Sequence, residues 1–275
     1  MARLEMHFNG TFALKREEVS RILKAASEEK ALDDTLKDLA DRTSLGGPKV
    51  GKIKSWAERS GLVKGKHLTS EGELVWKLDP YLELYITYWL MHFYLSFGSK
   101  GLQKPPNQTY DWGGWSYFVY SFLPQNKVFT ATDLLNSGGA IFEEKSDVIS
   151  QRFSFILRAY TESQALASCG FLTKQGEKYY AYNNNLDNYY LIGYFLAKLW
   201  ERDFGATTSV LTHDILNQKM GLAPVLGVDA STLQRYLNEM GTLEIIEHRR
   251  TVSPAQIIRR WDDPMTLLEK AYANQ

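Results

Sequence analysis

The sequence predicts a mainly α-helical protein in which tandem winged helix-turn-helix units, each with a small β-hairpin, pack on aromatic-rich helices. Three observations lead to this prediction. Apolar residues recur at helical spacing along the chain. A glycine between a helix and an apolar strand occurs in SGLV, CGFL and MGTL, and long aromatic stretches lie between these junctions. The predicted parts are an N-terminal winged helix-turn-helix (1–78), an aromatic helical spine with a long loop (79–128), a second winged-helix-like unit (129–186) and a C-terminal winged-helix-like unit (187–275).

The first unit follows from helical spacing and turn chemistry. Leucines at i, i+4 and i+7 predict a helix over residues 32–39, and the turn TSLGGP comes next. Val50, Ile53 and Ala57 predict a second helix, which Gly61 ends as a left-handed cap. The residues LVKGKHLT then form two short strands around a basic turn.

The order repeats in the second unit. Residues 130–136 predict a short helix, with a turn at residues 137–139. A longer helix carries apolar residues from Ile149 to Tyr160, and the hairpin FLTKQGEKYYAY follows Gly170.

In the third unit we expect residues 209–220 to be helical. Asp229 suits the N-cap of a helix that carries Leu233, Leu237 and Met240 and ends at Gly241. Strands are expected over residues 243–247 and 256–261.

The stretches between the units predict a spine and a loop. PYLELYITYWLMHFYLSF is almost long enough to span a membrane, but its Glu83, His92 and many aromatic rings favour a buried helix, so no membrane partner is expected. Residues 98–115, rich in proline and glycine, predict a long exposed loop.

Composition narrows the class of protein. Lys plus Arg and Asp plus Glu are both 32, so a nucleic-acid partner would need local basic patches rather than a global field. Cys169 is the single cysteine, which excludes a disulfide framework and a cysteine-rich zinc site. The early residues Arg3, Glu5 and His7 interrupt any apolar run, so no signal peptide is expected and a cytoplasmic location is favoured.

The residues GGPKVGKI resemble a phosphate-binding loop but lack its chemistry. Ile53 stands where Ser or Thr would hold magnesium, and Pro48 removes a backbone donor. The same segment instead suits a helix entering a DNA groove, because Lys52, Ser55 and Arg59 at i, i+3 and i+7 share one face. The other interpretation is an ordinary solvated helix face.

Residues 47–66 hold six basic side chains and one acidic side chain, and two arginines are expected at the tip of the third hairpin. The predicted contacts to double-stranded DNA are Lys49, Lys52, Lys54, Ser55, Arg59, Lys64, Lys66, Arg249 and Arg250.

The sequence contains no recognisable catalytic motif, so no catalytic residue and no metal ligand is assigned. Carboxylate–x–Lys pairs, which metal-dependent nucleases use on strands, occur at Glu28/Lys30 and Glu143/Lys145, but both fall in stretches of helical period. A DNA nickase that uses Mg²⁺ or Mn²⁺ remains an alternative; without it no cofactor is expected. A scaffold whose winged helices bind only proteins is the other alternative.

The runs MHFNGTFALKREEV, VGKIKSWAERSGLV, LDPYLELYITYWLMHFYL and TLQRYLNEMGTLEI, in this order, resemble the bacterial domain-of-unknown-function family 4007. The resemblance implies a part in DNA phosphorothioation and phage defence. One branch resembles a DNA-nicking component that works beside a cysteine desulfurase, an ATP-pyrophosphatase and an ATPase. Where the family pattern reads Phe-Ser-Gly-His-Glu-Thr-Phe, this chain runs from Gly10 directly into Thr11 and Phe12. That departure favours DNA binding over cleavage, and no residue role is carried over.

Overall fold

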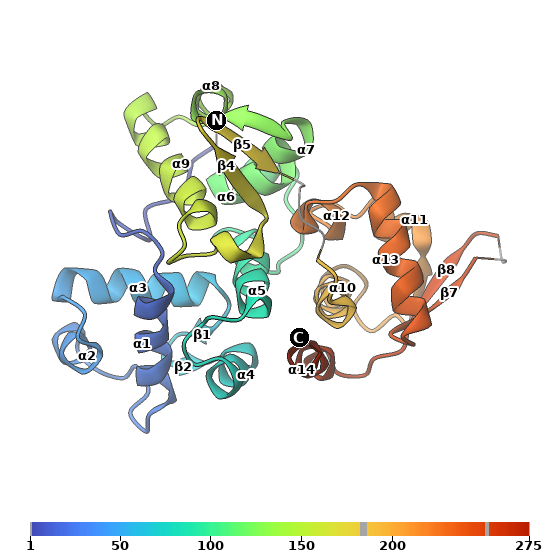
Figure 1. The fold of residues 1–275 in the computed structure, drawn as a ribbon, viewed down its shortest axis with the longest axis horizontal. Coiled ribbons are helices and arrows are strands. Elements are labelled where there is room, and N and C mark those ends of the chain that lie inside the picture. The colour runs from blue at the N-terminus through green and yellow to red at the C-terminus, as the bar shows by residue number, and fades with distance from the viewer. Residues whose placement is uncertain (1, 182–185, 251–252, 275) are drawn as a thin grey trace.

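The N-terminal part of the chain is a group of four helices with one short hairpin. The computed structural model describes residues 2–181, 186–250 and 253–274, and about 55% of it is helical, which confirms the mainly α prediction (Figure 1). The elements of this part are α1 (Arg16–Ser27), α2 (Leu36–Thr43), α3 (Gly47–Arg59), β1 (Val63–Lys64), β2 (His67–Leu68) and α4 (Ser70–Leu78).

Local chemistry accounts for the bounds of these helices. Thr35 caps α2 by accepting a hydrogen bond from the Asp38 amide. Pro48 lies in the first turn of α3, where no amide donor is needed. Gly61 follows α3 with φ of 76°, and a Cβ there would lie 2.4 Å from the Tyr94 ring, so only glycine fits.

Two aromatic helices form the centre of the molecule: α5 (Tyr85–Leu95) and α10 (Tyr189–Phe204). Their rings Phe93 and Phe195 stack with centroids 4.3 Å apart. The prediction of a buried helix within residues 80–97 is confirmed, because nearly every side chain of α5 is buried. Within the described residues, no helix has the length and apolar character needed to cross a bilayer.

The segment after α5 is less exposed than predicted. It contains η1 (Thr109–Trp112) and α6 (Gly114–Tyr117), and the rings of Trp112 and Trp115 are buried. The expectation of an exposed loop over residues 98–115 is therefore wrong for its second half. The two indoles bury enough apolar surface to fix the backbone against the core.

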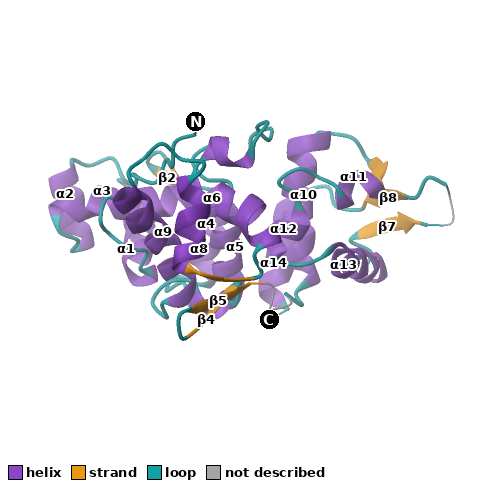
Figure 2. Cartoon of the chain, turned by 90° about the horizontal axis from the view of Figure 1, so that it is seen from above, coloured by secondary structure: helices purple, strands orange, loops and turns teal. Residues whose placement is uncertain are grey.

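The middle part places a three-stranded sheet beside two helices (Figure 2). Its elements are α6, η2 (Phe118–Phe122), α7 (Leu123–Gln125), β3 (Val128–Thr130), α8 (Ala131–Gly139), α9 (Ser146–Thr161), η3 (Ala167–Cys169), β4 (Leu172–Gln175) and β5 (Lys178–Ala181). The strand order is β3-β5-β4, all antiparallel. The predicted turn at residues 137–139 is wrong. Gly138 lies inside α8, where a Cβ would meet the Phe153 ring at 2.3 Å.

The C-terminal part repeats this order of elements after α10: β6 (Ser209–Leu211), α11 (Thr212–Leu216), α12 (Leu222–Leu226), α13 (Ala230–Thr242), β7 (Ile246–Arg249), β8 (Gln256–Arg259) and α14 (Pro264–Ala273). The strand order β6-β8-β7 matches that of the middle part. Figure 1 shows α13 and the β7–β8 hairpin at the end of the molecule opposite α2.

Three expectations for this part are wrong, and one of them is the strand over residues 243–247, because β7 begins only at Ile246. Residues 209–211 form a strand rather than a helix, because Val210 pairs with the buried Ile257 of β8. Gly241 lies inside α13, and the left-handed residue after the helix is Glu244, with φ of 57°.

Candidate nucleic-acid interface

The outward face of α3 is covered by the N-terminal segment. We call residues 2–15 the N-terminal strap. The Phe8 ring meets Trp56 edge to face with centroids 4.8 Å apart, and Trp56 Nε1 donates a hydrogen bond of 3.1 Å to the carbonyl of Phe12. Trp56 is completely buried as a result. Helical periodicity predicted that this side of α3 faces solvent. In the structure the N-terminal strap packs across it.

The strap also packs against two of the residues that were predicted to contact DNA. The Arg59 guanidinium lies 4.6 Å from the centre of the Phe8 ring, and burial lowers the pKa of Arg59. Gly10 lies against the stem of Lys52, with 3.4 Å between a Cβ built on Gly10 and Lys52 Cε. Arg152 of α9 holds the strap from the other side by donating to the Gly10 carbonyl at 2.5 Å.

Other basic residues of the first unit that were predicted to contact DNA form ion pairs within the protein. Lys49 Nζ lies 2.5 Å from Glu18 Oε1 of α1. Lys54 Nζ lies 3.9 Å from Glu58 Oε1, one turn along α3. Long-lived access of these lysines to a polyanion would require the carboxylates to be displaced.

The β1–β2 hairpin is more open than α3. Lys64 is exposed and has no ion pair within the described part of the chain. Lys66 pairs with Asp33, and this hydrogen bond lowers the pKa of Asp33. Both partners are exposed, so the pair competes weakly with other anions. Ser55 donates its hydroxyl to the Gly51 carbonyl at 3.0 Å and so is engaged within α3.

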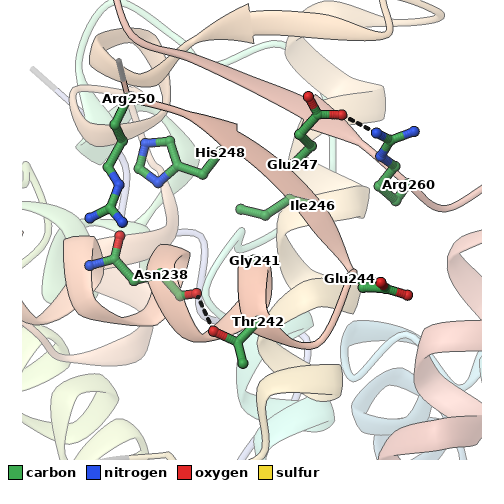
Figure 3. A pocket seen from close by; sticks show the side chains of 9 residues that line it. All are labelled: Asn238, Gly241, Thr242, Glu244, Ile246, Glu247, His248, Arg250 and Arg260. Carbon is green, nitrogen blue, oxygen red and sulfur yellow. Dashed lines mark hydrogen bonds and ion pairs between the residues drawn. The ribbon is translucent and has the colours of Figure 1, made fainter.

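An open groove of about 710 Å³ lies between α13 and β7 (Figure 3). We call it the C-terminal groove. Its lining residues are Asn238, Gly241, Thr242, Glu244, Ile246, Glu247, His248, Arg250 and Arg260. Of the predicted contacts, Arg250 lines this groove and Arg249 lies on the same hairpin. The structure therefore separates the predicted set into two surfaces.

Charge in the C-terminal groove is arranged around Glu247. Arg249 Nε donates to Glu247 Oε1 at 2.5 Å, and Arg260 pairs with the other carboxylate oxygen. These partners, Arg249 first, lower the pKa of Glu247. Arg250 is exposed and makes no ion pair with any described residue. An anionic ligand can therefore bind Arg250 in the groove without first displacing a carboxylate.

His248 supplies a polar atom at the wall of the groove. Its Nε2 lies 3.2 Å from the Thr212 hydroxyl, and its Nδ1 is buried without a hydrogen-bond partner among the described residues. Burial, and then the nearby Arg250, lower the pKa of His248. A neutral imidazole with one unused nitrogen therefore borders the groove.

Sequence reasoning did not select Asn238 or His248. The signal that could have found Asn238 is its spacing, since it lies opposite Leu233, Leu237 and Met240 on the same helix. His248 follows from no local pattern, because its hydrogen-bond partner Thr212 is far away in the sequence.

No metal site can be assigned from the donor atoms. Among the described residues, no three His, Cys, Asp or Glu side chains gather closely enough to hold an ion.

Two solved structures share this fold. A magnesium ion-bound SspB crystal structure matches with a TM-score of 0.72 and 16% identity, covering 100% of this chain and 91% of the matched chain. A second SspB crystal structure matches with a TM-score of 0.71 and 16% identity, covering 97% of this chain and 87% of the matched chain. No protein-family model matches the sequence, and no curated protein matches it. At this level of identity the likeness shows the fold.

Proposed function

We propose that this chain is a double-stranded DNA-binding component of a bacterial phosphorothioation-type DNA-modification or defence system, and that the C-terminal groove leads the contact. The observation that carries the proposal is Arg250, an arginine without an ion pair among the described residues, in an open groove beside the exposed side of α13. The fold neighbours support the setting, because SspB is a phosphorothioation-associated protein of a DNA-modification system. The resemblance to family 4007 points to the same setting.

We further propose that the repeated parts are winged helix-turn-helix units, divided as the sequence suggested at residues 78, 128 and 186. The order of α10, β6, α11, α13, β7 and β8, with strand order β6-β8-β7, supports this interpretation for the third unit. In such a unit the last helix enters the major groove and the hairpin contacts the backbone. α13 and the β7–β8 hairpin are the elements in those positions.

The first unit is proposed as a second, weaker contact. Lys64 on the β1–β2 hairpin can reach a phosphate directly, and Lys66 can do so after leaving the exposed Asp33. Lys49 and Arg59 would first have to leave Glu18 and the Phe8 ring. Because desolvating an ion pair costs part of the energy gained from a phosphate, we rank this surface second.

Fluorescence anisotropy with a labelled short duplex tests the proposal. About two to four phosphate contacts predict a slope of roughly −2 to −4 in log affinity against log salt. Arg250→Glu should weaken binding and flatten this slope by about one, whereas Lys24→Glu, an exposed basic residue on α1, should leave both unchanged. Lys64→Glu should have a smaller effect than Arg250→Glu.

No binding at low salt would contradict the DNA-binding proposal. Co-purification with neighbouring proteins in that case would favour the scaffold alternative instead. Incubation of supercoiled plasmid with Mg²⁺ or Mn²⁺ checks the nickase alternative. Nicking that is lost on chelation would support that alternative.

A further inference from the structure

The outward face of α13 carries a continuous stripe of polar side chains. Ser231, Arg235, Asn238 and Thr242 lie at i, i+4, i+7 and i+11, so they share one side of the helix. Ser231, Arg235 and Thr242 are exposed, and Asn238 is half-buried at the edge of the C-terminal groove. The opposite side of the helix is the buried side, formed by Leu233, Tyr236, Leu237 and Met240.

The open hydrogen-bonding groups of this stripe belong to Arg235 and Asn238, because Ser231 donates its hydroxyl to Asp229 Oδ1 at 2.8 Å and Thr242 donates its hydroxyl to the Asn238 carbonyl at 3.3 Å. Arg235 has no ion pair among the described residues, and its guanidinium lies 5.1 Å from the neighbouring Tyr236 ring. Asn238 Oδ1 accepts from Gln234 Nε2 at 3.4 Å, a long contact that leaves its amide donor unused. Figure 3 shows the Asn238 amide on the same side of the groove as Arg250. At the N-cap, Asp229 accepts from the Thr232 amide at 2.8 Å.

These residue types match the donors and acceptors of base edges. Asn pairs through two hydrogen bonds with adenine, Arg with guanine, and Ser or Thr with either. Ser, Thr and Asn side chains also contact phosphates, but a surface that binds mainly the DNA backbone draws most of its affinity from lysines and arginines. The stripe of α13 holds one positive charge in four residues, so its composition favours bases over the backbone.

The corresponding helices of the other parts do not offer the same surface. The outward face of α3 lies under the N-terminal strap, as Trp56 shows by its complete burial. On α9, Arg152 donates to the Gly10 carbonyl of the strap and Arg158 pairs with Glu162. α13 is thus the helix of the three whose polar face is open and carries an arginine that makes no ion pair with a described residue.

We propose that α13 reads base edges in the major groove, so that the chain prefers a defined duplex sequence, with Asn238 and Arg235 as the specificity-determining residues. Arg250 supplies a phosphate contact that is independent of sequence. This inference rests on the proposed DNA-binding function and adds to it the class of DNA that is bound.

The test is a selection from a library of duplexes with a randomised centre, using the full chain, followed by affinity measurements on an enriched duplex and a shuffled one. Asn238→Ala and Arg235→Ala should each lower affinity for the enriched duplex by roughly tenfold or more, and should change affinity for the shuffled duplex by less than about twofold. Gln151→Ala, an exposed polar residue on α9, is the matched control and should change neither. Circular dichroism of each variant checks that the helices are intact.

DNA binding and base reading by α13 can be contradicted separately. Binding without enrichment of any sequence, or an equal loss on both duplexes in the Asn238 and Arg235 variants, overturns base reading by α13 and leaves DNA binding standing. An absence of binding to every duplex at low salt overturns both. Arg250→Ala separates the contributions, since it should weaken both duplexes equally and lower the salt slope by about one.

Discussion

His92 connects three parts of the molecule from the middle of α5, and its protonation should control acid stability. Its Nε2 lies 2.7 Å from the Val225 carbonyl of α12, and its Nδ1 lies 2.7 Å from the Tyr160 hydroxyl of α9. Because a carbonyl can only accept, Nε2 carries the proton and Nδ1 accepts from Tyr160. Trp115 Nε1 donates to the same hydroxyl at 3.0 Å. The neutral ring is therefore the form that satisfies all partners.

Burial lowers the pKa of His92 from 6.5 to about 4. Between these values the unfolded chain binds a proton that the folded chain does not, so the free energy of unfolding falls as the pH is lowered through this window. Above about pH 7 both states are neutral and the contribution is constant. Each pH unit within the window costs about 1.4 kcal/mol, so about 2 kcal/mol should be lost by pH 5 and about 3 kcal/mol by pH 4.

Urea unfolding followed by tryptophan fluorescence measures this effect in the wild type and in His92→Gln. Glutamine offers an acceptor for Tyr160 and a donor for Val225 but does not titrate. Between about pH 7 and pH 5 the wild type should lose about 2 kcal/mol more than the variant, whatever their difference at pH 7. Parallel curves for the two proteins over this range would refute the assignment of a neutral, buried imidazole.

Three further substitutions test the packing and the charges. Gly72→Ala should destabilise the fold by at least about 3 kcal/mol in a urea titration, because its Cβ would lie 1.9 Å from the Leu62 carbonyl oxygen; a loss below about 1 kcal/mol would contradict that close approach. Phe8→Ala should cost about 2–4 kcal/mol by removing the ring that covers α3, whereas Tyr81→Ala, at a residue 72% exposed, should cost less than about 0.5 kcal/mol. Glu247→Gln should release two arginines, strengthen DNA binding and steepen the salt slope by about two; unchanged binding would show that these arginines do not face DNA.

Local pattern in the sequence determined some of the helices and hairpins of this protein, whereas the helix expected over residues 32–39 begins only at Leu36. The spacing of Val50, Ile53 and Ala57 gave α3, and that of Leu233, Leu237 and Met240 gave α13. Both periodicities arise from backbone geometry over a few residues, so they can be predicted without knowledge of the rest of the chain. The same reasoning failed at residues 209–211, where pairing with a strand far along the chain decided the conformation.

The tertiary structure alone decided which faces stay open. Helical spacing put Arg59 on the outward face of α3, but it could not show that Phe8 crosses that face or that Lys49 meets Glu18 of α1. The open groove beside α13 likewise depends on where β7 packs. Exposure and ion pairing depend on how segments distant in sequence pack together to bury their aromatic side chains, whereas helical period depends only on neighbours along the chain.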